Sequence, residues 1–115
     1  MEAPVHGHRV YVVGWSQLDV MKVGVGKGNY RERQFINCGA RLLDYYMEDS
    51  DPFGLEAVAE SVIRDYPQPF ATRLEAIGIC GRKGSGFLEC RLIPAADWPD
   101  VLACIRREVA AHGYS

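Results

Sequence analysis

The chain has 115 residues, of which 48% are hydrophobic and 24% are charged. This length and composition are typical of one globular domain, and they argue against two domains or intrinsic disorder. The formal net charge of −2 excludes an overall positive field that would attract nucleic acid, so any contact with DNA has to come from a local basic patch.

The first elements of the chain predict a β-hairpin. Residues Arg9–Val13 are β-branched or aromatic after the first, and we expect a strand that ends at Gly14. A second strand, Val20–Gly24, follows a short polar turn, so the two strands should pair antiparallel. The glycine-rich residues 25–28 match neither the P-loop nor the Rossmann spacing, and we expect them to form a turn.

The middle of the chain predicts two helices around a third strand. We expect a short helix over Tyr30–Asn37, with Asn29 as its N-cap, and a strand over Arg41–Met47. From Phe53 to Tyr66 the apolar residues recur at helical spacing, which gives the clearest helix in the sequence. Two prolines after Tyr66 end this helix.

The last third of the chain predicts a strand and a helix. Residues 72–80 fit either a helical turn or a strand, and Phe87–Ile93 is expected to be a strand. A C-terminal amphipathic helix carries Val101, Ile105 and Val109 on its apolar face. Together the elements predict an α+β fold in one domain, with a three-stranded antiparallel sheet flanked by helices, followed by a C-terminal strand and helix.

The ends and the cysteines of the chain bear on its location. Residues 1–8 are expected to be a flexible tail without the apolar segment of a signal peptide, and no run approaches the roughly 20 apolar residues of a membrane span. We therefore expect a cytoplasmic protein that does not contact membranes. The four cysteines, Cys38, Cys80, Cys90 and Cys104, form no C-x-x-C pair and are expected to be reduced and mostly buried. Their spacing does not favour a zinc site.

Five short segments, taken in order, resemble one known family. Val10-Tyr11 lies in the first expected strand, Val23-Gly24 in the second, Asn29–Arg33 opens the short helix, Glu60 lies in the long helix, and Gly84–Glu89 precedes the last strand. In this order and spacing they resemble the two strand motifs, the helix arginine, the metal-binding glutamate and a glycine–aromatic–glutamate segment of GIY-YIG nucleases. The resemblance covers about residues 9–92 and is strongest to branches found in phage and mobile elements.

Two positions depart from the family pattern, and two others leave a choice open. Arg9 replaces the glycine of the first motif, and Lys22 replaces the tyrosine of the second, as in some branches of the family. One extra loop residue leaves either Arg31 or Arg33 in register with the family arginine, and we favour Arg33. Glu56 lies one helical turn before Glu60 and is an alternative for its role.

The resemblance implies metal-dependent hydrolysis of DNA, with one Mg²⁺ or Mn²⁺ ion held by Glu60. Tyr11 would orient or deprotonate the attacking water. Lys22 would either supply the positive charge that lowers the pKa of the tyrosine or act as the base itself. Arg33 would contact the non-bridging phosphate oxygens. Further basic residues would bind the DNA backbone, namely Lys27, Arg31, Arg82 and Lys83.

Two other hypotheses remain open. The chain could be a non-catalytic module on the same fold that binds DNA or another protein, which the replaced motif residues and the net negative charge favour. Alternatively the resemblance is accidental, and an apolar helix face such as Leu55, Val58 and Val62 serves as a partner surface. An enzyme could act alone or as a homodimer. Convergence of Tyr11 and Glu60 with the helix arginine in one pocket would favour the enzyme.

Overall fold

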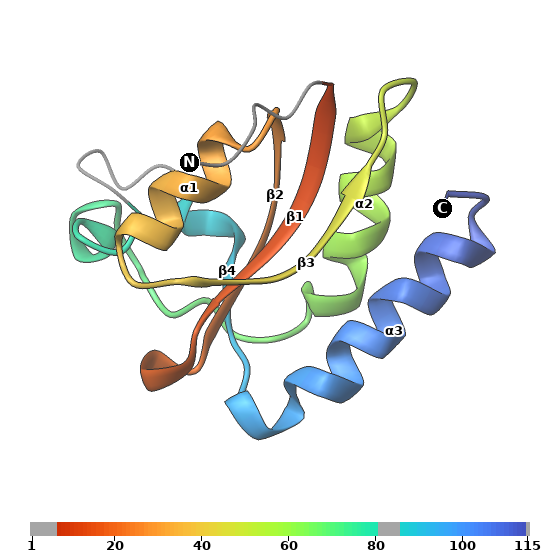
Figure 1. Ribbon diagram of the computed structural model, residues 1–115. Coiled ribbons are helices and arrows are strands. Elements are labelled where there is room, and N and C mark those ends of the chain that lie inside the picture. Colours follow the sequence, from red (N-terminus) through yellow and green to blue (C-terminus); the bar gives the residue numbers. More distant parts are fainter. Residues whose placement is uncertain (1–6, 81–85, 115) are drawn as a thin grey trace.

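The computed structural model describes residues 7–80 and 86–114, and over these ranges the chain forms a four-stranded antiparallel sheet with three helices (Figure 1). The strands are β1 (His8–Trp15), β2 (Val20–Lys27), β3 (Arg41–Met47) and β4 (Cys90–Leu92), in the spatial order β3-β1-β2-β4. The helices are α1 (Tyr30–Asn37), α2 (Pro52–Ile63) and α3 (Trp98–Ala111). The expected α+β class and the antiparallel pairing are confirmed.

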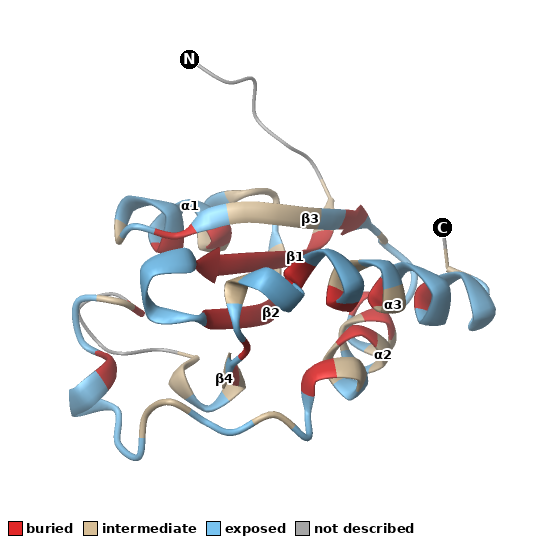
Figure 2. Ribbon diagram, turned by 90° about the horizontal axis from the view of Figure 1, so that it is seen from below, coloured by how far each residue is buried: buried red, intermediate tan, exposed pale blue. Residues whose placement is uncertain are grey.

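The expected hairpin of β1 and β2 forms the centre of the sheet. The two strands pair over their full length, from His8 opposite Lys27 to Trp15 opposite Val20. A single 3-10 turn, Ser16–Leu18, connects them. Because β1 lies between β2 and β3, all of its residues after His8 are buried (Figure 2).

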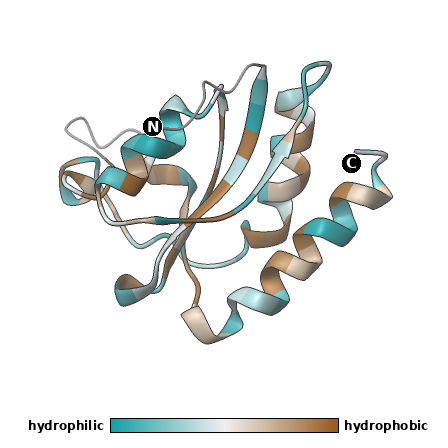
Figure 3. Cartoon of the chain, in the orientation of Figure 1, coloured by the Kyte–Doolittle hydropathy of each residue, from teal (hydrophilic) through white to brown (hydrophobic). Residues whose placement is uncertain are grey.

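Alternating side chains of the hairpin build a separate core on each face of the sheet. Val10 and Val12 point to the face covered by α2 and α3, whereas Tyr11 and Val13 point to the face covered by α1, where Phe35 packs against them. Hydrophobic residues run along the central strands β1 and β2 (Figure 3). The sheet thus buries both sides, which explains the long apolar runs in β1 and β2.

Helix α2 begins where the sequence provides a cap. The Asp51 carboxylate accepts a hydrogen bond of 3.1 Å from the Gly54 amide, and Pro52 occupies the first turn, where its missing N–H costs nothing. The Tyr114 hydroxyl donates to the same carboxylate at 2.7 Å and ties the end of the described chain to this helix. The helix ends at Ile63, three residues before the expected end at Tyr66.

The glycine-rich segment after Gly24 was expected to be a turn, and that expectation is wrong. Strand β2 continues through Gly26 to Lys27, and only Gly28 turns, with a φ of +64°. The glycines remain in the strand because side chains from neighbouring elements occupy the space beside them. A Cβ atom at Gly26 would lie 2.9 Å from Cγ of Arg31.

The C-terminal strand is shorter than expected and belongs to the main sheet. Phe87–Glu89 forms a 3-10 turn after Gly86, which has a φ of +78°, so the strand begins only at Cys90. As β4 it pairs with Val20–Lys22 and makes the sheet four-stranded rather than three-stranded. Residues 72–80, left open between helix and strand, contain one 3-10 turn, Leu74–Ala76.

His8, the last residue of the expected N-terminal tail, belongs to β1, and residues 1–6 lie outside the described residues. None of the helices in the described ranges combines the length and apolarity that a membrane crossing requires.

Candidate functional site

Tyr11 and Lys22 meet on the α1 face of the hairpin. Tyr11 of β1 lies directly opposite Gly24 of β2, and Lys22 precedes Gly24 by two residues, so its side chain points to the same face. A Cβ atom at Gly24 would lie less than 3 Å from both the Tyr11 hydroxyl and the Lys22 ammonium. The glycine therefore leaves the space in which these two groups come together.

Both groups are buried with few polar contacts. Tyr11 is 1% exposed and Lys22 is 2% exposed. The Tyr11 hydroxyl has no hydrogen-bond partner among the described residues. The Lys22 ammonium donates to the Val23 carbonyl at 3.4 Å and lies 4.9 Å from the centre of the Phe35 ring, and no carboxylate of the described chain forms an ion pair with it. Buried polar groups are normally satisfied, so this arrangement suits a bound water or ligand atom.

Arg31 brings a second cation to Tyr11. Its aliphatic stem crosses Gly26 of β2, and its half-buried side chain leaves the first turn of α1 toward the tyrosine. Burial raises the pKa of Tyr11, and the positive charge of Arg31 opposes that increase. Nε of Arg31, like the tyrosine hydroxyl, is buried and has no hydrogen-bond partner in the part of the chain that the structure describes.

The structure places Arg33, which the sequence favoured over Arg31, elsewhere. Arg33 is exposed and lines a cavity of about 270 Å³ on another side of α1. Arg9 and Glu32 line the same cavity and form an ion pair of 2.8 Å. Since successive helical residues are rotated by about 100°, Arg31 and Arg33 cannot both face Tyr11.

Two glutamates of α2 approach the site from the other side of β2. Strand β4 covers only Val20–Lys22, so the rest of the β2 edge has no strand partner among the described residues, and α2 packs beside β2. Burial, and next the charge of Glu60, raises the pKa of Glu56 to about 7, while Lys22 opposes this increase. Burial and the charge of Glu89 likewise raise the pKa of Glu60, again against Lys22.

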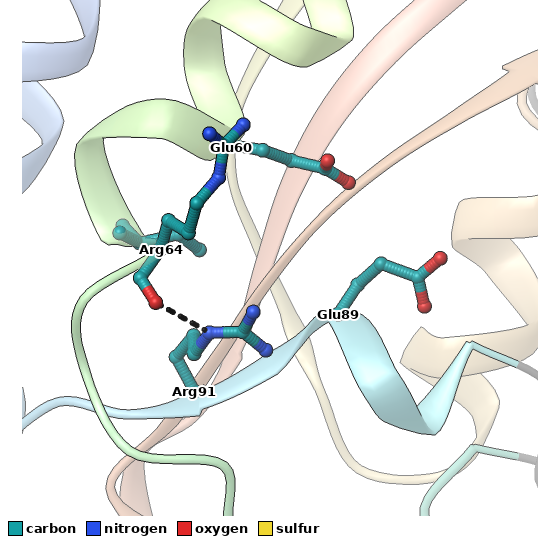
Figure 4. A pocket seen from close by; sticks show the side chains of 5 residues that line it. Glu60, Arg64, Glu89 and Arg91 are labelled. Atoms are coloured by element: carbon teal, nitrogen blue, oxygen red, sulfur yellow. Dashed lines mark hydrogen bonds between the residues drawn. The ribbon is translucent and has the colours of Figure 1, made fainter.

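Glu89 contributes a third carboxylate. Glu60 and Glu89 reach from α2 and from the turn before β4 into the same small pocket of about 40 Å³ (Figure 4). Arg91 holds this turn in place, because its side chain donates to the Arg64 carbonyl at 3.3 Å and to the Cys90 carbonyl at 2.8 Å. A Cβ atom at Gly86 would lie 3.1 Å from Nζ of Lys22 and 3.5 Å from Oε2 of Glu89, which links this pocket to Lys22.

The carboxylates suit a hard divalent cation. Mg²⁺ and Mn²⁺ prefer oxygen ligands, and Mg²⁺ is commonly held by one or two carboxylates while waters and phosphate oxygens complete its shell. The negative charge of Glu89 contributes to the raised pKa of Glu60. A bound cation would offset this repulsion between the two carboxylates. In the described ranges no group of three or more His, Cys, Asp or Glu side chains forms a ready ligand set.

The remaining predicted DNA-binding residues are not part of this cluster. Lys27 is exposed at the opposite end of β2 from Lys22, five residues or about 17 Å away along the strand. Arg82 and Lys83 lie outside the described residues. The sequence analysis missed Glu89 as a neighbour of Glu60, although the family-like segment that ends at this residue was a usable signal.

No protein-family model, curated protein or solved structure matches the chain.

Proposed function

We propose that the chain is a metal-dependent endonuclease that hydrolyses phosphodiester bonds in DNA by a GIY-YIG-like mechanism. Three observations carry the proposal: Tyr11 and Lys22 meet beside Gly24, Arg31 crosses Gly26 and acts electrostatically on Tyr11, and Glu60 lies within electrostatic range of Lys22. Two of these residues, Tyr11 and Lys22, are almost fully buried, which is uncommon for polar side chains without a function or a partner.

The proposed roles follow from the charge of each group. The Tyr11 hydroxyl positions the attacking water, because burial keeps the phenol protonated at neutral pH. The Lys22 ammonium stabilises negative charge that develops on the water or on the tyrosine oxygen. Glu56, with a pKa of about 7, accepts the proton that the water loses. Arg31, rather than Arg33, contacts the non-bridging phosphate oxygens.

Glu60 is the residue proposed to hold the cation. When bound, a divalent ion there would supply charge neutralisation for the pentavalent phosphate. Arg64 lines the Glu60 pocket, and its positive charge opposes the increase in the pKa of Glu60. From this position it can bind a neighbouring phosphate.

A plasmid-nicking assay with Mg²⁺ or Mn²⁺ tests the proposal. Nicking should stop with EDTA and should fall at least about 100-fold in Tyr11→Phe and Glu60→Gln. Arg31→Ala should lose about 30-fold, whereas Arg33→Ala, the matched change on the other side of the helix, should lose less than about 3-fold. Nicking that survives both Tyr11→Phe and Glu60→Gln would overturn the proposal. A larger loss in Arg33→Ala than in Arg31→Ala would restore the assignment favoured by the sequence.

A non-catalytic DNA- or protein-binding module is the second candidate. The net charge of −2 favours it, because a nuclease usually carries a stronger positive field for its polyanionic substrate. A gel-shift assay separates the two candidates. DNA bound by the wild type without cleavage under any metal condition would favour the module.

A further inference from the structure

Two free cysteines lie beside the proposed site with their sulfur atoms almost in contact. Cys80 and Cys90 are 5% and 0% exposed, and their Sγ atoms are 3.6 Å apart. A disulfide needs an S–S distance of about 2.05 Å, so its formation requires a movement of only about 1.5 Å. Cys38 and Cys104 are also free but only half-buried. Two of the four thiols are thus buried, and they form a close pair that the sequence spacing did not reveal.

The pair is physically continuous with Lys22 and Tyr11. Cys90 of β4 lies opposite Lys22 in the β2–β4 ladder, and its thiol donates to the Gly86 carbonyl at 3.8 Å. Cys80 and Cys90 also belong to the same apolar cluster as Tyr11. A shift of either sulfur is therefore transmitted to the residues that surround the lysine ammonium.

Cys80 is the more reactive member of the pair. It is the thiol with residual exposure, and its contact with the Cys90 sulfur lowers its pKa, with a further contribution from the positive charge of Lys22. The thiolate is the form that reacts with oxidants, so a lowered pKa favours Cys80 as the first sulfur to be oxidised. Cys90, fully buried, is positioned to resolve the product.

We propose that Cys80 and Cys90 form an oxidative modification site, at which a hydroperoxide converts the two thiols into an intramolecular disulfide. The Cys80 thiolate attacks the terminal peroxide oxygen, the O–O bond breaks, and the departing alkoxide takes a proton to become an alcohol. Cys80 is then a sulfenic acid. Cys90 attacks that sulfur, the S–S bond forms as the S–O bond breaks, and hydroxide leaves with the Cys90 proton as water. One hydroperoxide is reduced and two thiols are oxidised.

The disulfide should slow the proposed cleavage reaction. Closing the bond draws Cys90 toward Cys80 and so disturbs the register of β4 against Lys22. It also removes the Cys90 contact to Gly86, whose backbone packs against the lysine side chain. This consequence rests on the proposed function, whereas the disulfide itself does not.

Peptide mapping tests the modification without reference to activity. The folded protein is treated with hydrogen peroxide, its free thiols are alkylated, and it is digested with trypsin. Cleavage after Arg73, Arg82, Lys83 and Arg91 places Cys80 in peptide 74–82 and Cys90 in peptide 84–91. We expect these two peptides cross-linked with a loss of two hydrogen atoms, and separated again by dithiothreitol. Thiol titration should fall from four groups to two.

Two variants make the mapping specific. Cys80→Ala should abolish the cross-link, and Cys104→Ala, a change to a half-buried thiol on α3, should retain it. Circular dichroism of both variants before oxidation shows whether they fold. Wild-type protein in which peroxide yields only sulfinic or sulfonic acid, or disulfides that involve Cys38 or Cys104 in equal amount, would overturn the proposal.

The nicking assay then tests the connection to the site. Oxidised wild type should cleave about 10-fold more slowly than reduced protein and should recover with dithiothreitol, while Cys80→Ala should be insensitive to the treatment. A cross-link without any change in cleavage would refute the coupling to Lys22. If the reduced protein does not cleave DNA at all, the proposed function fails, and the cross-linked peptides still decide whether the modification site exists.

Discussion

Arg9 and Tyr11 point to the same face of β1, two residues apart, yet their polar groups are satisfied in opposite ways. Arg9 forms an ion pair of 2.8 Å with Glu32 of α1, and its guanidinium lies 3.7 Å from the centre of the Tyr45 ring. Tyr11 and its neighbour Lys22 have no ion pair within the described chain, and the tyrosine hydroxyl has no hydrogen bond there. All four of the charged or hydroxyl-bearing side chains are buried.

The difference separates a structural cluster from the one that we propose to be functional. A buried ion pair neutralises its own charges and is costly to break, so its residues serve the fold, although Nε of Arg9 and Oε1 of Glu32 meet without hydrogen-bond geometry. A buried ammonium without an ion pair and a buried hydroxyl without a well-formed hydrogen bond lower the stability of the free protein, and such groups are retained where a ligand or a reaction intermediate completes them. The comparison predicts that substitutions at the two clusters have opposite effects on stability and activity.

The largest effect on stability is expected at the Arg9–Glu32 pair. Arg9→Met should lower the free energy of unfolding by about 3 kcal/mol, because it removes the buried guanidinium that forms the ion pair with the Glu32 carboxylate. The midpoint and slope of urea unfolding measure this change. The matched control is Arg106→Met, which removes an ion pair to Asp44 from an exposed side chain and should cost less than about 1 kcal/mol. Equal losses in both variants would show that burial does not strengthen the Arg9 pair.

The opposite pattern is expected at Lys22. Lys22→Met keeps the length of the side chain, removes a buried charge and should leave the free energy of unfolding within about 0.5 kcal/mol of the wild type or above it. The same variant should cleave DNA about 100-fold more slowly. Lys27→Met, a change at the exposed end of the same strand, is the control for the effect on stability of losing one positive charge. A Lys22→Met variant that unfolds as easily as Arg9→Met would assign the lysine to the fold rather than to the site.

The sequence predicted most of the fold because its hydrophobic patterns are local. The limits of α1 and β3 were predicted correctly, and α2 was predicted to within three residues, since each has a clear periodicity or a cap. The glycines of β2 misled the prediction. In isolation they favour a turn, whereas in the fold they provide room for Tyr11 and Arg31, which reach them from other elements.

The site was predictable only in its residue types. Tyr11, Lys22 and Glu60 were named from their spacing, and the structure brings them together. The choice between Arg31 and Arg33 depends on which side of α1 faces the sheet, and both occur on a short helix whose apolar face is defined by little more than Phe35. Glu89 and the close approach of Cys80 to Cys90 depend on how β4 docks on β2, which no local pattern encodes.

The smallest expected effect concerns Glu56 and depends on pH. Its pKa is raised from an ordinary value of 4.5 to about 7. Between these values the folded protein binds more protons at Glu56 than the unfolded chain does, so the contribution of this residue to stability is lost as the pH rises through 7. Glu56→Gln cannot ionise. The variant should therefore be more stable than the wild type by about 1 kcal/mol at pH 8, after allowance for solvent screening of a half-buried group, and no more stable at pH 4.

Thermal or urea unfolding at both pH values measures this difference, with Glu108→Gln on the exposed side of α3 as the control. A gain that is equal at pH 4 and pH 8 would show that the amide packs better and that ionisation is not involved. If Glu56 also accepts the proton of the attacking water, wild-type cleavage should rise with pH through about 7, and Glu56→Gln should lose that rise together with most of its activity. Because the carboxylate that weakens the fold above pH 7 is then the form that the reaction requires, the stability gained by the amide should level off near pH 7, where wild-type activity reaches half its maximum.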